Sequence, residues 1–247
     1  MSPMTFVPLG VGDAFSARYY SSCLFVESEG EALLIDCPHP IRKMMREASA
    51  SSGVTIDVDR VSAVVLTHLH ADHSSGLEGL GYFSHFVLGK RARILAHPDV
   101  TARLWSGHLA AGMERLLVDG KRQEMYLGDY FGITPLSNED PAQHGPFSVE
   151  CRLTVHPVPT TALRIRAGGR CLAYSADTSF DDGLIDWLSV GDVAIHETNC
   201  GLHTPYEKLA GLPEALRRRM RLIHYPDEFE TGASAIEALV QGRRYEV

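Results

Sequence analysis

Three histidines and one aspartate fall within the six residues from His68 to His73, in the order His-x-His-x-Asp-His. The segment 61–66, which Thr67 separates from His68, is apolar and rich in β-branched residues, which predicts a buried strand. The segment after them, 74–80, can open a helix. Ligand sites in α/β proteins form where a strand ends and a helix begins. This cluster therefore predicts a functional site within an α/β fold.

The spacing within the cluster favours metal binding. His68 and His70 are two residues apart, so their rings point to the same side of an extended backbone. Asp72 and His73 follow on the turn and can face a second point nearby. Neutral imidazole and carboxylate are good ligands for zinc and similar divalent ions. A polar loop that is histidine-rich by chance is the alternative, but the position at the end of an apolar strand favours a metal site.

Composition limits the classes of partner. The chain has 247 residues, 45% of them hydrophobic and 22% charged, which is typical of a soluble protein built as one domain over 1–247. Its net charge of −8 argues against long nucleic acid, which normally requires a basic surface. A small phosphate ester held by metal ions is compatible with that charge.

The sequence also predicts a cytoplasmic protein that does not enter a membrane. Residues 1–5 lack the basic start of a signal peptide, and no segment approaches the roughly 20 apolar residues of a membrane span. The five cysteines include no Cys-x-x-Cys pair, so we expect them to be reduced. They are Cys23, Cys37, Cys151, Cys171 and Cys200.

Several apolar segments with strand character end on a histidine or an aspartate. We expect these side chains to converge on one edge of a sheet. They are His68, His156, Asp177, His196 and His224. Elsewhere we expect two strands and a loop within 105–147, near the mouth of the site, and a C-terminal helix over 231–240. Asp36 ends a further strand, where it either supports a histidine ligand or caps the next helix.

The cluster at 68–73 resembles the signature of the metallo-β-lactamase superfamily. This resemblance implies an α/β fold, a four-layer αβ/βα sandwich, with a metal centre at one edge of two packed sheets. It also implies two divalent metal ions, for which zinc is our first choice and manganese or iron are alternatives. The ligands that it assigns are His68, His70 and His156 for one ion, Asp72, His73 and His224 for the other, and Asp177 between them.

Three further segments are similar to the ribonuclease Z and phosphodiesterase branch of that superfamily. They are Tyr174-Ser175-Ala176-Asp177-Thr178, Ile195-His196-Glu197-Thr198, and Leu202-His203-Thr204. Ala176 replaces the usual glycine, and Thr204-Pro205 replaces the usual Ser-Thr. Only twenty residues separate His156 from Asp177, which leaves no room for the tRNA-gripping arm of ribonuclease Z.

The same resemblance assigns catalytic roles to Asp72, His203 and Glu197. His203 would be a general acid or a phosphate ligand, and Glu197 would orient it. The alternatives are that His203 is an exposed loop histidine and that Glu197 is an ordinary surface acid. His196 is either functional or a structural residue beneath the site. For His85, His97, His108 and His144 we expect structural or surface roles.

The function predicted from the sequence is a binuclear metal-dependent phosphodiesterase. It would hydrolyse a small ester, such as a cyclic phosphodiester or a cyclic nucleotide, through a metal-bridging hydroxide. One alternative is a lactone, thioester or other carboxylic ester hydrolase on the same fold. A second is a non-catalytic metal-containing binding or sensor protein. Beyond a small-molecule substrate, the partner that we expect is a second copy of the chain, in a homodimer.

Overall fold

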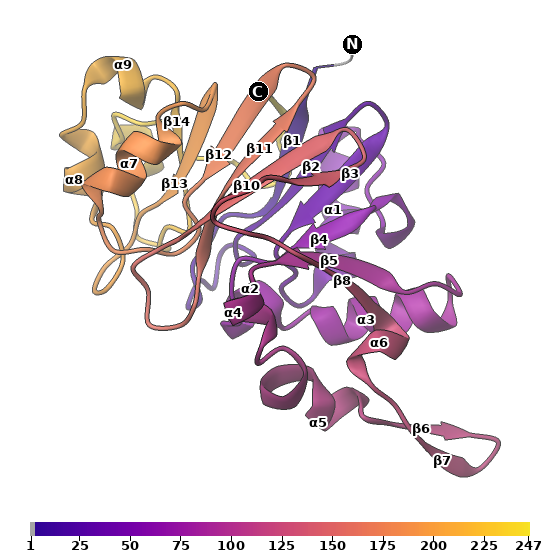
Figure 1. Ribbon diagram of the computed structural model, residues 1–247. Helices are drawn as coiled ribbons and strands as arrows, with labels where there is room; N and C mark the ends of the chain where they lie inside the picture. Colours follow the sequence, from indigo (N-terminus) through magenta and orange to yellow (C-terminus); the bar gives the residue numbers. More distant parts are fainter. Residues whose placement is uncertain (1–2) are drawn as a thin grey trace.

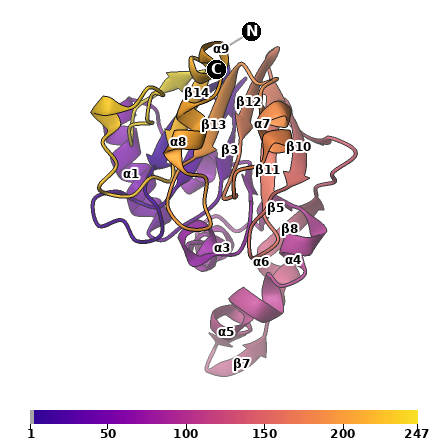
Figure 2. The same ribbon diagram turned by 90° about the vertical axis from the view of Figure 1, so that its left-hand side faces the viewer.

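The computed structural model describes residues 3–247 and confirms a four-layer αβ/βα sandwich. Two sheets pack face to face, and helices cover their outer faces (Figures 1 and 2). Within the described residues the first sheet has seven strands in the order β15-β1-β2-β3-β4-β5-β8. Their bounds are Thr5–Gly10 (β1), Cys23–Ser28 (β2), Glu31–Ile35 (β3), Ala63–Val65 (β4), Ala92–Ala96 (β5), Phe131–Pro135 (β8) and Tyr245–Glu246 (β15).

The second sheet has six strands in the order β14-β13-β12-β11-β10-β9, again within the described residues. Strands β12, β13 and β14 are parallel, and β11 runs antiparallel to both β10 and β12. The carboxyl ends of β10, β12, β13 and β14 therefore lie at one end of this sheet. The bounds are Ala142–His144 (β9), Phe147–Leu153 (β10), Thr161–Ala167 (β11), Arg170–Tyr174 (β12), Val193–Glu197 (β13) and Met220–Ile223 (β14).

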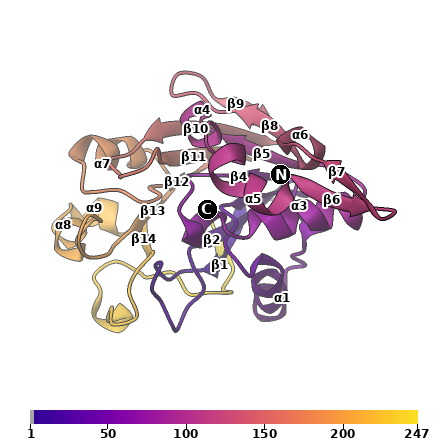
Figure 3. The ribbon, with the colours of Figure 1, turned by 90° about the horizontal axis from the view of Figure 1, so that it is seen from below.

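Both faces of the first sheet are buried, which explains its continuous apolar strands. In β4, Ala63 and Val65 face the core between the sheets, whereas Val64 packs toward the helices. Helices α1 and α3 cover this outer side, and α7, α8 and α9 lie outside the second sheet (Figures 1 and 3). The helix bounds are Ile41–Ser52 (α1), Ala71–Ser74 (α2), Leu77–Phe86 (α3), Pro98–Thr101 (α4), Ala110–Met113 (α5), Leu127–Tyr130 (α6), Asp182–Leu188 (α7), Tyr206–Ala210 (α8) and Glu214–Arg217 (α9).

The segment 105–147 contains more structure than the two strands and a loop predicted for it. A π-helix, η2 (Trp105–Leu109), leads through α5 into a hairpin of β6 (Arg115–Val118) and β7 (Lys121–Glu124). Helix α6, β8 and β9 follow. The β6–β7 hairpin projects away from the two sheets (Figures 1 and 3).

The predicted C-terminal helix over 231–240 is wrong. Only a 3₁₀ turn, η3 (Thr231–Ala233), forms there, and the chain then runs extended beside β14. Leu222 donates its N–H to the carbonyl of Glu237 and accepts the N–H of Leu239. These bonds satisfy the exposed edge of β14, so tertiary pairing overrides helix propensity here. A further 3₁₀ turn, η1 (Val58–Arg60), precedes β4.

Among the helices of residues 3–247, none combines the length and the apolar character needed to cross a bilayer.

Candidate metal centre

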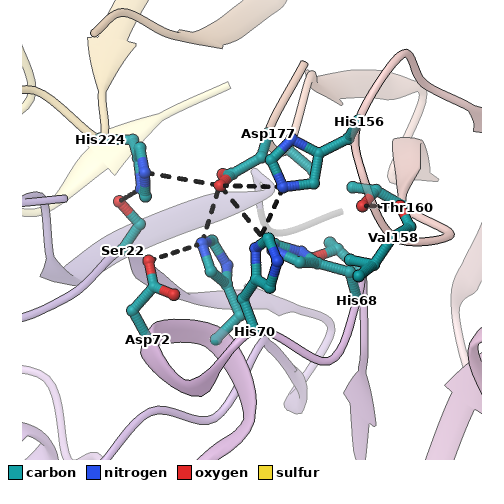
Figure 4. Close-up of polar contacts among 12 residues, drawn as sticks. Ser22, His68, His70, Asp72, His156, Val158, Thr160, Asp177 and His224 are labelled. Carbon is teal, nitrogen blue, oxygen red and sulfur yellow. Dashed lines mark hydrogen bonds and ion pairs between the residues drawn. The ribbon is translucent and has the colours of Figure 1, made fainter. Parts of the chain in front are cut away.

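The predicted site residues gather where the two sheets meet, so the expectation of one edge of a single sheet needs correction. His68 and His70 follow β4 of the first sheet, and Asp72 and His73 lie on the short helix α2. The second sheet supplies the remaining three ligand candidates. His156 follows β10, Asp177 follows β12 and His224 follows β14. Figure 4 shows six of these side chains pointing toward a common centre, those of His68, His70, Asp72, His156, Asp177 and His224.

Two groups of four residues share Asp177. The first contains His68, His70, His156 and Asp177, and the second contains Asp72, His73, Asp177 and His224. Within each group, one ligand atom per residue lies within 4.8 Å of all the others. This division is the one that the resemblance implied.

In the first group, Nε2 of His68 lies 3.7 Å and Nε2 of His156 lies 3.9 Å from Oδ2 of Asp177. Nδ1 of His70 lies 3.1 Å from Nε2 of His156. Most of these separations are too long for hydrogen bonds. They resemble instead the spacing of about 3.4 Å between atoms arranged tetrahedrally around one zinc ion.

The second group has similar spacing. Nε2 of His73 lies 3.3 Å from Oδ1 of Asp177 and 3.4 Å from Oδ2 of Asp72. Nε2 of His224 lies 3.5 Å from Oδ2 of Asp177. The Asp177 carboxylate thus faces four imidazoles, two from each group.

The other nitrogen of three of these rings faces an oxygen. Nδ1 of His68 lies 3.0 Å from Oγ1 of Thr67, Nδ1 of His73 lies 2.8 Å from Oδ2 of Asp36, and Nδ1 of His224 lies 3.3 Å from Oγ of Ser22. A proton on Nδ1 leaves the lone pair of Nε2 free and aimed at the centre.

Asp36 supports the histidine cluster and does not cap a helix, because Pro40 occupies the N-cap of α1. Its buried carboxylate also accepts hydrogen bonds from the N–H and hydroxyl of Thr67. A side chain at Gly76 would collide with the backbone carbonyls of Cys37 and Pro38. The close approach that glycine permits lets the loop after β3 pack against α2, which holds Asp36 beneath His73.

Left-handed backbone occurs at three non-glycine residues around the centre. Asp36 has φ of 61°, Ala176 of 50° and His224 of 57°. The left-handed backbone region favours glycine. The conformation of Ala176 therefore explains why glycine is usual at this position in the ribonuclease Z and phosphodiesterase branch. Such strained positions cluster at functional sites.

Burial prepares two of the rings to bind a cation. It lowers the pKa of His68 well below its ordinary value and lowers the pKa of His156 to about 4. Both imidazoles are therefore neutral at pH 7, which is the form that coordinates a metal. Burial also acts on His73, but the carboxylates of Asp177 and Asp36 outweigh it and raise the pKa of that ring.

The residues present fit a pair of divalent cations. Nε2 of His68, Nε2 of His73, Nδ1 of His156 and Oδ1 of Asp177 are buried and have no hydrogen-bond partner among residues 3–247. Buried polar atoms normally find a partner, and a cation would satisfy most of these atoms together.

Beside the centre, the Glu197 carboxylate accepts a hydrogen bond from Nδ1 of His203. Glu197 is buried, so it is not the ordinary surface acid of the alternative interpretation, and His203 is half-buried. The ring of His203 lies 5.6 Å from that of His156 and 5.3 Å from that of His224, measured between centroids. His203 therefore stands over both ligand groups, next to the space where a substrate would react.

The remaining histidines lie outside this arrangement. His196 is buried in β13 with Nδ1 on the carbonyl of Glu197, which favours a structural role. His144 lies 3.2 Å from the hydroxyl of Ser62, and His97 lies at the start of α4. Two residues that contact the ligand candidates, Thr67 and Ser22, were not predicted from the sequence. Thr67 directly precedes the motif and could have been noticed, whereas Ser22 is 202 positions from His224 and carries no local signal.

Comparison with known proteins gives a family match. The family model described as anti-Pycsar protein Apyc1 matches residues 4–243. A protein named anti-Pycsar protein Apyc1 from Bacillus phage 010DV004 is 30% identical over 261 residues, covering 98% of each chain. Another protein of that name, from the bacterium Saccharibacillus brassicae, is 29% identical over 255 residues, covering 97% of this chain and 98% of its own.

Solved structures confirm the predicted fold. The metallo-β-lactamase fold protein YhfI from Bacillus subtilis has a TM-score of 0.77 at 20% identity, with complete coverage of both chains. A diphosphatase of the PhnP family has a TM-score of 0.75 at 15% identity, covering 99% of this chain and 98% of its own. The short form of human tRNase Z has a TM-score of 0.70 at 18% identity, covering 98% and 99%. At these identities the likeness concerns the fold alone.

Proposed function

The chain belongs to the family described as anti-Pycsar protein Apyc1, and from this premise we propose that it is a binuclear metal-dependent phosphodiesterase. Its substrate would be a small ester, such as a cyclic phosphodiester or a cyclic nucleotide. The observation that carries the proposal is the position of Asp177, which two groups of ligand candidates share.

Seven residues would hold the two ions. They are His68, His70, Asp72, His73, His156, Asp177 and His224. Two divalent ions would supply a nucleophile at neutral pH and would neutralise charge on the phosphoryl oxygens. Zinc suits this mixture of imidazole and carboxylate, and manganese or iron are alternatives.

The chain's own residues would supply the remaining chemistry. His203 would donate a proton from its exposed nitrogen, Nε2, to the departing oxygen, because Glu197 already occupies Nδ1. Asp72 would act as a carboxylate ligand of the second ion, next to Nε2 of His73. Thr67, Ser22 and Asp36 would fix the tautomers of three rings.

The net charge of the chain and the short segment between His156 and Asp177 both favour a small substrate. The net charge of −8 disfavours a long nucleic acid, whose phosphate backbone normally requires a basic surface. Residues 161–174, between His156 and Asp177, form β11, a tight turn and β12, so this interval holds no projecting arm.

Comparative hydrolysis tests the proposal. We expect the metal-reconstituted protein to hydrolyse bis(p-nitrophenyl) phosphate faster than a lactone or a thioester. Preferential turnover of the lactone or thioester would contradict the proposal and favour a carboxylic ester hydrolase. Saturable ligand binding with no product from any of the three substrates would favour a binding or sensor protein.

A further inference from the structure

A pocket of about 270 Å³ opens beside the first group of ligand candidates. Leu69, which lies between His68 and His70, forms one wall, and Val158 and Pro159, which follow His156, form another. Asp99 and Val100 of α4 and the neighbouring Arg103 complete it. The pocket therefore shares two of its segments with the first group of ligand candidates, and a substrate that reacts at the centre would extend along these segments into it.

We propose that this pocket receives the base of a nucleotide substrate and that Arg103 determines specificity there. The inference rests on the proposed phosphodiesterase function and names the part of the substrate that does not react. The volume is near the lower end of ligand pockets, which suits one or two fused rings and not a whole nucleotide.

The walls suit a flat ring. Leu69, Val100, Val158 and Pro159 are apolar. In the described part of the chain, Val158 and Pro159 belong to neither hydrophobic core; Val158 is half-buried and Pro159 is exposed. Figure 4 shows Val158 on the side of His68 and His156, opposite His224. A ring lying against Leu69, Val158 and Pro159 would remove their apolar surface from water, and Val100 is already buried beneath them.

Arg103 supplies donors at the rim. Within residues 3–247 its guanidinium group makes no ion pair and no hydrogen bond, unlike the arginines that are bound to carboxylates elsewhere. The lack of a side chain at Gly107 lets it lie close to η2, because a β-carbon there would lie 2.9 Å from Nε of Arg103. A guanidinium group donates to ring carbonyls and ring nitrogens of bases, and Asp99, which also lines the pocket, can accept from an amino group.

The other pocket near the His203 loop is a weaker candidate. Its volume is about 490 Å³, and its lining includes Cys200, Tyr206 and Phe229. Three carboxylates also line it, those of Glu207, Glu228 and Glu230. Their negative charge disfavours an anionic substrate, whereas the pocket beside Leu69 offers a free cation.

Three variants and a matched pair of substrates test the inference. Arg103→Ala removes the donors, and Gly107→Ala keeps the charge but pushes the Arg103 side chain out of position. Arg46→Ala removes an exposed arginine of α1 and serves as the control. The substrates are cyclic uridine or adenosine 3′,5′-monophosphate and the methyl riboside 3′,5′-cyclic phosphate, which has no base. Inhibition by free uridine and adenosine gives a binding readout independent of turnover.

We expect Arg103→Ala to raise KM for the cyclic nucleotides about tenfold, with a much smaller change in kcat. Inhibition by the nucleosides should weaken by a similar factor, and Gly107→Ala should show the same pattern more weakly. The base-free substrate should be unaffected, and Arg46→Ala should behave like the unmodified protein.

Equal losses on the base-containing and base-free substrates would overturn the inference, because Arg103 would then act on the phosphate. An unchanged KM for the nucleotides would also overturn it. If the unmodified protein hydrolyses neither kind of cyclic phosphate, the proposed function itself fails. The two outcomes above, by contrast, are seen in an active protein and count against the pocket assignment alone.

Discussion

Nδ1 of His203 lies 2.9 Å from Oε2 of Glu197 and 3.0 Å from Oε1. The Glu197 side chain is only 1% exposed, whereas that of His203 is 22% exposed. A buried carboxylate thus orients a partly exposed imidazole whose other nitrogen makes no hydrogen bond within residues 3–247. Because Glu197 holds His203, and neither residue is among the seven ligand candidates, the role of the proposed acid can be tested independently of metal binding.

Replacing His203 should affect leaving groups unequally. His203→Ala should keep both metals and near-normal stability, and its rate on an ester with a poor leaving group should fall by about 10²–10⁴. A nitrophenolate ester needs little help from a proton, so its rate should fall far less. The measurement is the ratio of the two losses, with metal content determined on the same sample and His85→Ala as the control. Equal losses would mean that His203 binds phosphate or shapes the pocket.

The pH dependence should depend on Glu197. Burial raises the pKa of Glu197 to about 7, and the hydrogen bond to Glu197 raises the pKa of His203 above its ordinary value. The pair therefore keeps a proton near neutral pH, and activity should fall as pH rises through the raised value. In Glu197→Gln the His203 pKa should drop toward about 6.5, so the alkaline fall in kcat should move to lower pH. If the alkaline fall in kcat lies at the same pH in Glu197→Gln and in the unmodified protein, the Glu197–His203 pair does not control that fall.

Asp36 should influence metal affinity without touching a metal. Asp36→Asn removes the carboxylate that lies 2.8 Å from Nδ1 of His73. Loss of such a supporting contact typically weakens metal binding about 10–100-fold. Competition with a fluorescent chelator measures the dissociation constant, and Asp186→Asn, an exposed position on α7, is the control. Affinity equal to that of the control would show that Asp36 only stabilises the fold.

We also expect a homodimer. The β6–β7 hairpin projects from the body and exposes Leu117 (72%) and Val118 (44%), which suits contact with a second copy. Light scattering at micromolar concentration should give twice the 27.1 kDa mass of one chain. A mass of 27.1 kDa would reject this expectation.

The ligand candidates could be named from the sequence because their signals are local. His68 to His73 form one short motif, and His156, Asp177 and His224 each follow an apolar strand. Strands that run in the same direction have their carboxyl ends at the same end of a sheet. Residues that follow such strands therefore lie close together although they are far apart in the sequence. The apolar run before His68 is likewise explained by a strand that is buried on both faces.

Features that depend on contacts between distant segments were not predictable. The role of Asp36 was undecided because only the fold places it beneath His73, and the partner of His224 lies at Ser22. The C-terminal helix was wrong because the backbone near Glu237 pairs with Leu222 instead. Likewise, the pocket beside Leu69 joins three segments that are separate in the sequence.

The most direct test of the central claim is to titrate the metal-free protein with a divalent metal. Bound metal and phosphodiester hydrolysis are measured at each point of the titration. Asp177 belongs to both groups, so we expect activity to rise to a plateau at two equivalents of zinc or manganese per chain. Thermal stability should rise with it, and Asp177→Ala should lose both responses. A plateau at one equivalent, or hydrolysis that survives complete removal of metal, would contradict the account.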